Sequence, residues 1–169
     1  MCELLKTRRS VRKYRPEQVP DKLLDAVLEA GLYAPSAMNN QQGAFYIVVQ
    51  EPEARKKIAE MNAAVMGTDR DPFYGAPCVI VVLADPGYPT WVEDGALVLG
   101  NLLNAAHAEH LGSCWINRAR EMFDTQEGKA LLGKWGVPEH YRGIGCCILG
   151  YADEAPAPKE RAANRIWKI

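Results

Sequence analysis

The sequence lacks long hydrophobic runs. Its longest nearly unbroken apolar stretch extends from Ala76 to Ala84 and contains a proline, whereas a membrane-spanning helix needs about 20 apolar residues. The first residues, Met1-Cys2-Glu3, lead directly into charged sequence without the apolar segment of a secretory signal. We therefore expect a cytoplasmic protein with no membrane partner.

An excess of charge of one sign is also absent. The 20 Lys and Arg residues nearly balance the 21 Asp and Glu residues, which gives a net charge of −1 and argues against a nucleic-acid partner. The cations nevertheless gather at two places, between Lys6 and Arg15 and between Lys159 and Lys168. Such runs are usually solvated surface. Two basic ends on a neutral chain also suit a small anionic ligand, such as a phosphate.

Metal-ligating residues are few and scattered. The five cysteines form no C-x-x-C pair, and most of them lie in apolar runs typical of strands, so we expect buried, reduced thiols. His107 and His110 lie three residues apart, but no Cys or carboxylate completes a set with metal spacing. We predict no metal site.

Several nucleotide-binding and catalytic motifs are missing. The chain has no Walker P-loop and no G-x-S-x-G nucleophile elbow. Gly143, Gly145 and Gly150 do not have the spacing of a dinucleotide-binding fingerprint, and no helix follows them. Any nucleotide-like phosphate would therefore be held by side chains, and no side-chain nucleophile or catalytic base is expected.

The chain length fits one domain over residues 1–169, because domains average about 150 residues. Alternating helix and strand patterns predict a layered sandwich. The strand over 78–83 is apolar on both faces and so belongs inside the sheet. The helix over 90–110 is apolar nearly all round, which indicates burial in a core or between subunits. We also predict helices over 2–7, 21–30, 52–62 and 126–135 and strands over 44–49, 113–117 and 144–150.

Three polar clusters can carry chemistry. Arg8 to Arg12 offers guanidinium groups that suit phosphate. The loop from Pro35 to Gln41 has small residues and amides that could hold a planar polar ring, and Lys159 to Arg161 adds cations from the tail. Taken singly, each cluster is more commonly a basic surface, an ordinary loop or a frayed terminus.

Taken together and in this order, the clusters resemble the FMN-dependent nitroreductase family. Leu5 to Tyr14 is similar to its N-terminal signature, and Ala34 to Gln41 to its A-P-S-x-x-N-x-Q loop. Other segments that resemble the family are Asn101–His107 (N-L-L-x-A-A-H), Leu111–Ile116 (L-G-T-C-W-I), Pro138–Tyr151 (ending in L-G-Y) and Pro158–Arg161 (P-K-x-R). The resemblance spans nearly the whole chain.

This resemblance implies an α+β fold, a three-layer α-β-α sandwich with a mostly antiparallel central sheet. It also implies a homodimer with two FMN sites at the subunit interface. Residues 153–169, which have too little apolar periodicity to fold on themselves, would form a C-terminal arm that packs on the partner subunit.

The resemblance also implies a set of cofactor-binding residues. In the family, residues matching Arg8, Arg9, Ser10, Lys159 and Arg161 hold the FMN phosphate and ribityl chain, and Arg12 matches a residue at the pyrimidine edge. Residues matching Pro35, Ser36, Ala37, Asn39 and Gln41 line the flavin ring, the first three from the partner subunit. The stretch matching Trp115, Ile116, Asn117 and Arg118 passes the flavin face and directs a backbone N–H toward N5.

The implied function is an oxidoreductase that passes electrons from NAD(P)H through FMN to a nitroaromatic, quinone or similar small acceptor by a ping-pong route. One alternative is a flavin-binding module for electron transfer or storage without NAD(P)H activity. Another is a relative that performs reductive dehalogenation or flavin fragmentation. The sequence leaves open whether NADH, NADPH or ferredoxin is the donor.

The chain departs from the family pattern at positions that bear on the acceptor. Gln42-Gly43 stands where a Pro-Trp pair is common, and Asn117-Arg118 stands where a glycine pair is common. Little sequence lies between Met61 and Ala76, or beyond Asn117, to form a lid.

Overall fold

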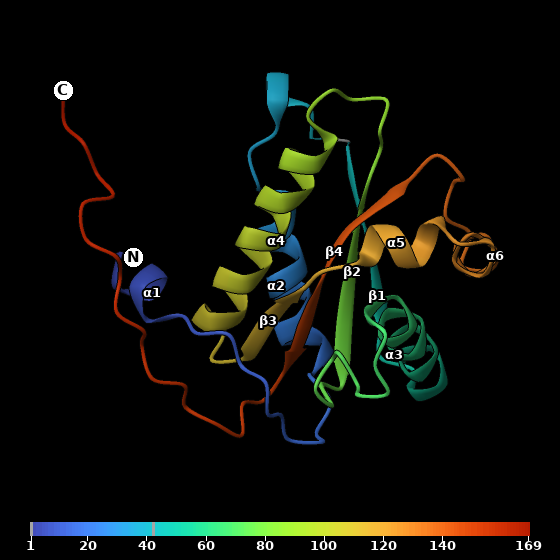
Figure 1. Ribbon diagram of the computed structural model, residues 1–169, viewed down its shortest axis with the longest axis horizontal. Coiled ribbons are helices and arrows are strands. Elements are labelled where there is room, and N and C mark those ends of the chain that lie inside the picture. The colour runs from blue at the N-terminus through green and yellow to red at the C-terminus, as the bar shows by residue number, and fades with distance from the viewer. Residues whose placement is uncertain (1, 42) are drawn as a thin grey trace.

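The computed structural model describes residues 2–41 and 43–169, and its centre is a four-stranded antiparallel sheet (Figure 1). The strands are β1 (Ala44–Val49), β2 (Cys78–Ala84), β3 (Gly112–Ile116) and β4 (Arg142–Gly150), in the order β1-β2-β4-β3. All seven residues of β2 are buried, because this strand lies between β1 and β4 with helices over both faces. The prediction of a central strand is therefore confirmed.

One face of the sheet is covered by α2 (Asp21–Leu32) and α4 (Trp91–Ala108), which lie side by side in Figure 1. Leucines and valines of these helices pack against alternate residues of β2 and β4 in one core cluster. Gly31 of α2 allows this contact, since a Cβ there would lie 2.8 Å from Leu102 Cδ2.

The opposite face is covered by α3 (Pro52–Met66), α5 (Ala119–Asp124) and α6 (Gln126–Lys134). Residues such as Ile58, Met122 and Phe123 form a second core cluster with the other side of the strands. The expected three-layer sandwich with an antiparallel sheet is confirmed.

Some element boundaries differ from the predictions. The predicted 52–62 helix continues to Met66 and ends where Gly67 adopts a left-handed φ of 69°. Helix α5 was not predicted, and β3 ends at Ile116, so Asn117 lies beyond the strand. Strand β4 begins at Arg142, two residues earlier than predicted, beside a register shift between Val82 and Leu83.

The N-terminal segment runs from α1 (Cys2–Thr7) along the edge of the sheet. Ser10 forms a parallel bridge with Ser113, and the Val11 N–H donates to the Ser113 carbonyl. Further on, the Asp153 N–H donates to the Lys13 carbonyl. These bonds hold the arginine-rich segment beside the start of the C-terminal tail.

The tail has no helix or strand beyond its bridge at Ala152, and its last thirteen residues are exposed. Figure 1 shows it passing α1 and leading away from the sheet. Its Trp167 side chain is 80% exposed, so nothing in the described part of this chain covers the apolar end of the tail.

The cysteine prediction is confirmed at four positions. Cys78, Cys114, Cys146 and Cys147 are buried free thiols, while Cys2 is exposed. Burial raises the pKa of Cys78 to about 12, so this thiol is not a reactive thiolate at neutral pH. Within residues 2–41 and 43–169, none of the helices combines the length and apolar character that a bilayer crossing requires.

Candidate functional site

A basic groove lies between the N-terminal segment and the tail. Its volume is about 320 Å³, and it brings together the residues predicted to hold a phosphate. The residues that line it are Arg8, Arg9, Ser10, Arg12, Pro156, Ala157, Lys159 and Arg161. The two clusters of cations, about 150 residues apart in the sequence, therefore meet in one chain.

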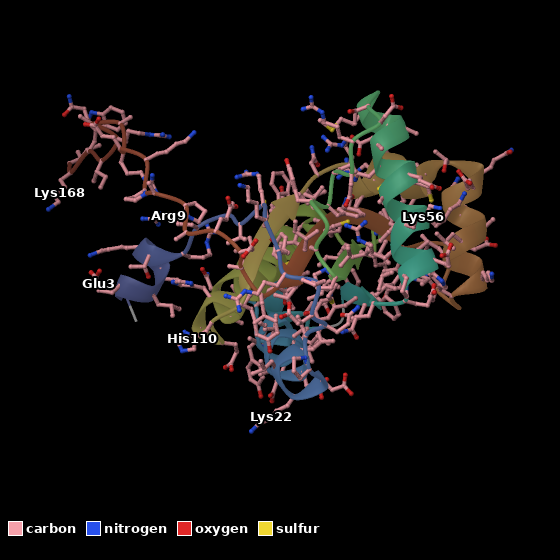
Figure 2. The ribbon with its side chains drawn as sticks, turned by 90° about the horizontal axis from the view of Figure 1, so that it is seen from below. Glu3, Arg9, Lys22, Lys56, His110 and Lys168 are labelled. Atoms are coloured by element: carbon pink, nitrogen blue, oxygen red, sulfur yellow. The ribbon has the colours of Figure 1, made fainter. Side chains whose placement is uncertain are left out.

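Two guanidinium nitrogens at this groove are buried without an acceptor. Arg8 Nη1 and Arg9 Nε have no hydrogen-bond partner among the residues described. Arg9 Nη1 donates to the carbonyls of Lys6 and Arg8, at 2.6 and 2.8 Å, so the rest of this side chain is held in place. Figure 2 shows Arg9 beside α1, on the side of the tail. An unmet buried donor is costly, so the groove is suited to an anion.

The C-terminal end of α4 contributes His107 next to the groove. Its Nε2 lies 3.0 Å from Thr7 Oγ1. Burial lowers the pKa of His107, and the charges of Arg8, His110 and Arg9 lower it further. The cations that favour an anion in the groove thus add to the effect of burial on this imidazole.

A second cavity, of about 480 Å³, lies beside the groove and shares Arg12 with it. Trp115, Ile116, Asn117 and Arg118, the predicted flavin-face stretch, line this cavity. The opposite wall comes from residues 66–74. The segment between Met61 and Ala76, expected to be too short for a lid, therefore forms a wall of this cavity.

Arg118 has a left-handed backbone, with φ 76°, at the N-terminus of α5. This conformation favours glycine, which is the residue common at this position in the family. Here the side chain compensates, because Arg118 Nε donates to Asn62 Oδ1 at 3.0 Å. The buried Asn62 also donates from Nδ2 to the Asn117 carbonyl at 2.9 Å. Asn62 was not predicted as a functional residue. It lies four positions after Ile58 and therefore on the same face of α3, and a polar residue on an apolar helix face is a signal of a buried polar contact.

The loop with Pro35, Ser36, Ala37, Asn39 and Gln41 lies at the other end of α4. The Ala37 N–H donates to Asp94 Oδ1 at 3.1 Å. Thr90 Oγ1 donates to Asp94 Oδ2, also at 3.1 Å, and Ser36 Oγ donates to the Asn40 carbonyl. Asp94, buried in the first turn of an apolar helix, thus anchors the loop and was also missed.

This loop lies far from the basic groove. Met38 and Asn39 have left-handed φ angles of 53° and 55°, and the side chain of Met38 is 88% exposed. Gln42, one of the two departures from the family pattern in this loop, lies outside the described residues. The loop contacts α4 at Asp94, and the groove lies near His107, a separation of about 20 Å along the helix at 1.5 Å per residue.

One chain thus brings together the predicted residues from Arg8 to Arg12 with those of the tail, and Arg12 with Trp115 to Arg118. It does not bring the Pro35–Gln41 loop to them. A site with all three clusters would need a loop from a second chain.

Comparison with known proteins supports the resemblance. Residues 5–69 match the model of the Nitroreductase family. A Methanothermobacter thermautotrophicus protein with the provisional name NADH dehydrogenase/NAD(P)H nitroreductase is 35% identical over 167 residues, which cover 95% of this chain and 81% of that protein. The FMN reductase [NAD(P)H] of Bacillus subtilis is 38% identical over 95% of this chain and 70% of its own length.

Solved structures with the same fold include nitroreductases. The crystal structure of a nitroreductase with bound FMN from Bacteroides fragilis superposes with a TM-score of 0.89 and 31% identity, over 99% of this chain and 97% of that one. Sequence and architecture agree along nearly the whole chain, and we conclude that it belongs to the nitroreductase family.

Proposed function

We propose that this protein is an FMN-dependent oxidoreductase that uses NAD(P)H to reduce a nitroaromatic, quinone or similar small acceptor. The observation that carries the proposal is the basic groove with two unpaired buried guanidinium nitrogens, adjoining a cavity that shares Arg12. The relatives named NAD(P)H nitroreductase and FMN reductase support the same function.

The residues present fit FMN. Within residues 2–41 and 43–169, Arg8 Nη1 and Arg9 Nε have no acceptor, and a phosphate would supply one. The remaining groove cations would add charge-assisted bonds. We assign the phosphate and ribityl chain to Arg8, Arg9, Ser10, Lys159 and Arg161, and the flavin ring to Arg12 and residues 115–118. Bound FMN would supply hydride acceptance from the nicotinamide and two-electron reduction of the acceptor in alternating steps.

The side chains would bind and tune rather than react. The guanidinium assigned to the pyrimidine edge, that of Arg12, would stabilise negative charge on a reduced flavin. The Asn62–Arg118 bond holds the backbone at residues 117 and 118 in one conformation. For a nitroaromatic, two electrons and two protons convert the nitro group to a nitroso group and water.

We also propose a homodimer in which each site takes its whole loop from the partner, so that Asn39 and Gln41 come from the partner together with the three residues expected from the resemblance. The separation of loop and groove along α4 supports this arrangement. So do unpartnered apolar side chains beside the loop and on α4, since Tyr33 is 77% exposed and Leu97 is 46% exposed. Of the expected C-terminal arm over residues 153–169, the part beyond the groove residue Arg161, with the exposed Ile166 and Trp167, would pack on the partner.

The test begins with the cofactor. The purified protein, denatured without added flavin, should release FMN, and the apoprotein should rebind it. Rapid mixing of the holoprotein anaerobically with NADH and with NADPH should bleach the flavin absorbance. Nitro, quinone and halophenol acceptors should then reoxidise it at different rates.

Three outcomes would count against parts of this proposal. A protein that binds no FMN, or a flavin reduced by ferredoxin and by neither nicotinamide, would overturn it. Turnover of halophenols alone would indicate dehalogenation instead. Cytoplasmic localisation is part of the proposal and is checked by fractionation.

A further inference from the structure

We propose that the acceptor carries an anionic group, such as a carboxylate on an aromatic ring, which Arg70 and Arg118 recognise. This inference rests on the proposed function and concerns the wall of the 480 Å³ cavity that the basic groove does not reach. The cavity is lined by three arginines and one acidic residue, an imbalance that the neutral chain as a whole does not have.

The acidic residue does not cancel these charges. Asp71 is paired with Arg55, whose Nη2 lies 2.5 Å from Asp71 Oδ2. The backbone N–H groups of Phe73 and Gly75 also donate to this carboxylate. Arg70, its neighbour in the sequence, has no carboxylate partner within the part of the chain that the structure describes. A free cation therefore stands beside a neutralised pair.

Arg118 is oriented by the protein rather than left to solvent. Its Nε donates to Asn62 Oδ1, and Asn62 is buried. No carboxylate pairs with its terminal nitrogens in the described residues. The fork of a guanidinium matches the two oxygens of a carboxylate, and an anchored fork loses less freedom on binding.

The same cavity offers flat apolar surfaces. Tyr74 and Trp115 both line it, and Arg12 lies over the Tyr74 ring at 5.9 Å from the centroid. Because Arg12 and Trp115 are assigned to the flavin ring, Tyr74 on the opposite wall is the surface on which an acceptor ring can stack. The charged substituent of that ring would then meet the guanidinium groups of Arg70 and Arg118. The cavity thus combines the two kinds of contact that an aromatic acid needs. A neighbouring cavity beside α4 is lined mainly by apolar residues. Its one arginine, Arg120, is matched by one carboxylate, Glu121, so it has no excess of positive charge.

The test compares two probes that differ in one charge, 4-nitrobenzoate and 4-nitrobenzamide. With the holoenzyme, we expect kcat/KM to favour the benzoate by about tenfold, as one charge-assisted contact allows. Calorimetric binding of each probe to the oxidised holoprotein should show the same preference without turnover. Arg70→Gln should reduce the preference for benzoate at least about threefold in both measurements and leave kcat/KM for the benzamide unchanged. Arg70→Lys should restore part of the lost preference. Arg70→Gln with Arg118→Gln should abolish the preference in both measurements.

Arg120→Gln is the matched control. It removes the same charge two residues from Arg118, but the Arg120 guanidinium lies 4.7 Å from the Trp91 ring centroid and faces the other cavity. This variant should keep the preference for benzoate.

The two proposals fail in different ways. Equal kcat/KM for both probes, with rapid reduction by NAD(P)H, would overturn the inference while the proposed function stands. If no nicotinamide reduces the flavin, the proposed function fails, and equal calorimetric affinities would then overturn the inference separately. If Arg70→Gln slows only the reduction of the flavin by NADPH, Arg70 binds the anionic donor rather than the acceptor, and the inference is also overturned.

Discussion

Arg12 is the residue that the groove and the cavity share, so it distinguishes a role at the flavin ring from a role at the phosphate. If its guanidinium faces the ring, it stabilises reduced anionic flavin more than oxidised neutral flavin. Losing about 1–3 kcal/mol of such stabilisation would lower the two-electron potential by about 20–60 mV. We expect Arg12→Ala to show this drop in a spectroscopic redox titration.

Arg8→Ala is the control for that measurement. Arg8 lines the groove and not the cavity, and its Nη1 is one of the unpaired buried donors. Its loss should weaken FMN binding and leave the potential nearly unchanged. Equal shifts in the two variants would place Arg12 at the phosphate instead.

His107 provides a second test at the residue scale. In the free protein, burial and then Arg8, His110 and Arg9 lower the pKa of His107 below its ordinary 6.5. A bound phosphate would offset the charge of the two arginines, so the pKa should rise when FMN binds. By linkage, FMN should then bind more tightly as the pH falls through this range. An NMR titration of the histidine with and without FMN measures the shift, and identical curves would remove the phosphate from this groove.

Single residues show what sequence patterns can and cannot predict. The cations of the groove were predictable because each lies in a contiguous motif, from Arg8 to Arg12 or from Lys159 to Arg161. Asn62 and Asp94 were not, because their roles come from partners 55 and 57 residues away in the sequence. A polar residue inside an apolar helix indicates burial with a partner but does not identify it.

At the scale of elements, the contact between α5 and β4 depends on a glycine. A Cβ on Gly143 would lie 2.4 Å from the backbone carbonyl atoms of Ala119, which cannot move as a side chain can. Gly143→Ala should therefore lower the free energy of unfolding by about 1–3 kcal/mol. At Gly133, an exposed position of α6, an added Cβ would meet nothing within 4 Å, so Gly133→Ala should raise the free energy of unfolding by up to about 1 kcal/mol. Urea unfolding of both variants measures these changes in the free energy of unfolding, and equal changes would contradict the packing argument.

Helix α5 illustrates why one element escaped prediction. It has six residues, too few for a 3.6-residue period to be distinguished from a strand or a loop. Its N-cap is Arg118, whose side chain donates to the distant Asn62 while its backbone is left-handed. Strand β2, by contrast, was predictable because burial on both faces requires an unbroken apolar run.

The tail is the element whose role in cofactor binding is most directly testable. Lys159→Ala with Arg161→Ala should weaken FMN binding, because each substitution removes a charge-assisted bond, and such bonds are worth about 1.5–3 kcal/mol at most. Fluorescence quenching of free FMN on titration with apoprotein measures the dissociation constant. Lys168→Ala with Arg165→Ala removes the same charge from the end of the tail, beyond the groove residues, and should have little effect. Equal weakening of FMN binding by the two double variants would indicate general electrostatic attraction by the tail rather than direct contact of Lys159 and Arg161 with the phosphate.

At the scale of the whole molecule, two ends of α4 hold the two halves of one proposed site. The groove near His107 contains the proposed phosphate ligands, and the Asp94-anchored loop contains the proposed ring-lining residues. Closed twofold assemblies place such separated patches of two identical chains against each other. The exposed apolar side chains beside the loop and on α4 are the surface that this assembly would cover.

Mixed dimers test this arrangement directly. Arg8→Ala with Arg161→Ala disables the groove, and Asn39→Ala with Gln41→Ala disables the loop, so each homodimer has two defective sites. A dimer with one chain of each kind would have one intact site and one doubly defective site. Because random pairing makes half of the dimers mixed, coexpression should restore about a quarter of the wild-type FMN sites in a twofold assembly. Differently tagged chains allow the mixed dimer to be isolated and its FMN content counted. If each site were built within one chain, every site in the mixed dimer would keep a defect, and coexpression would restore none.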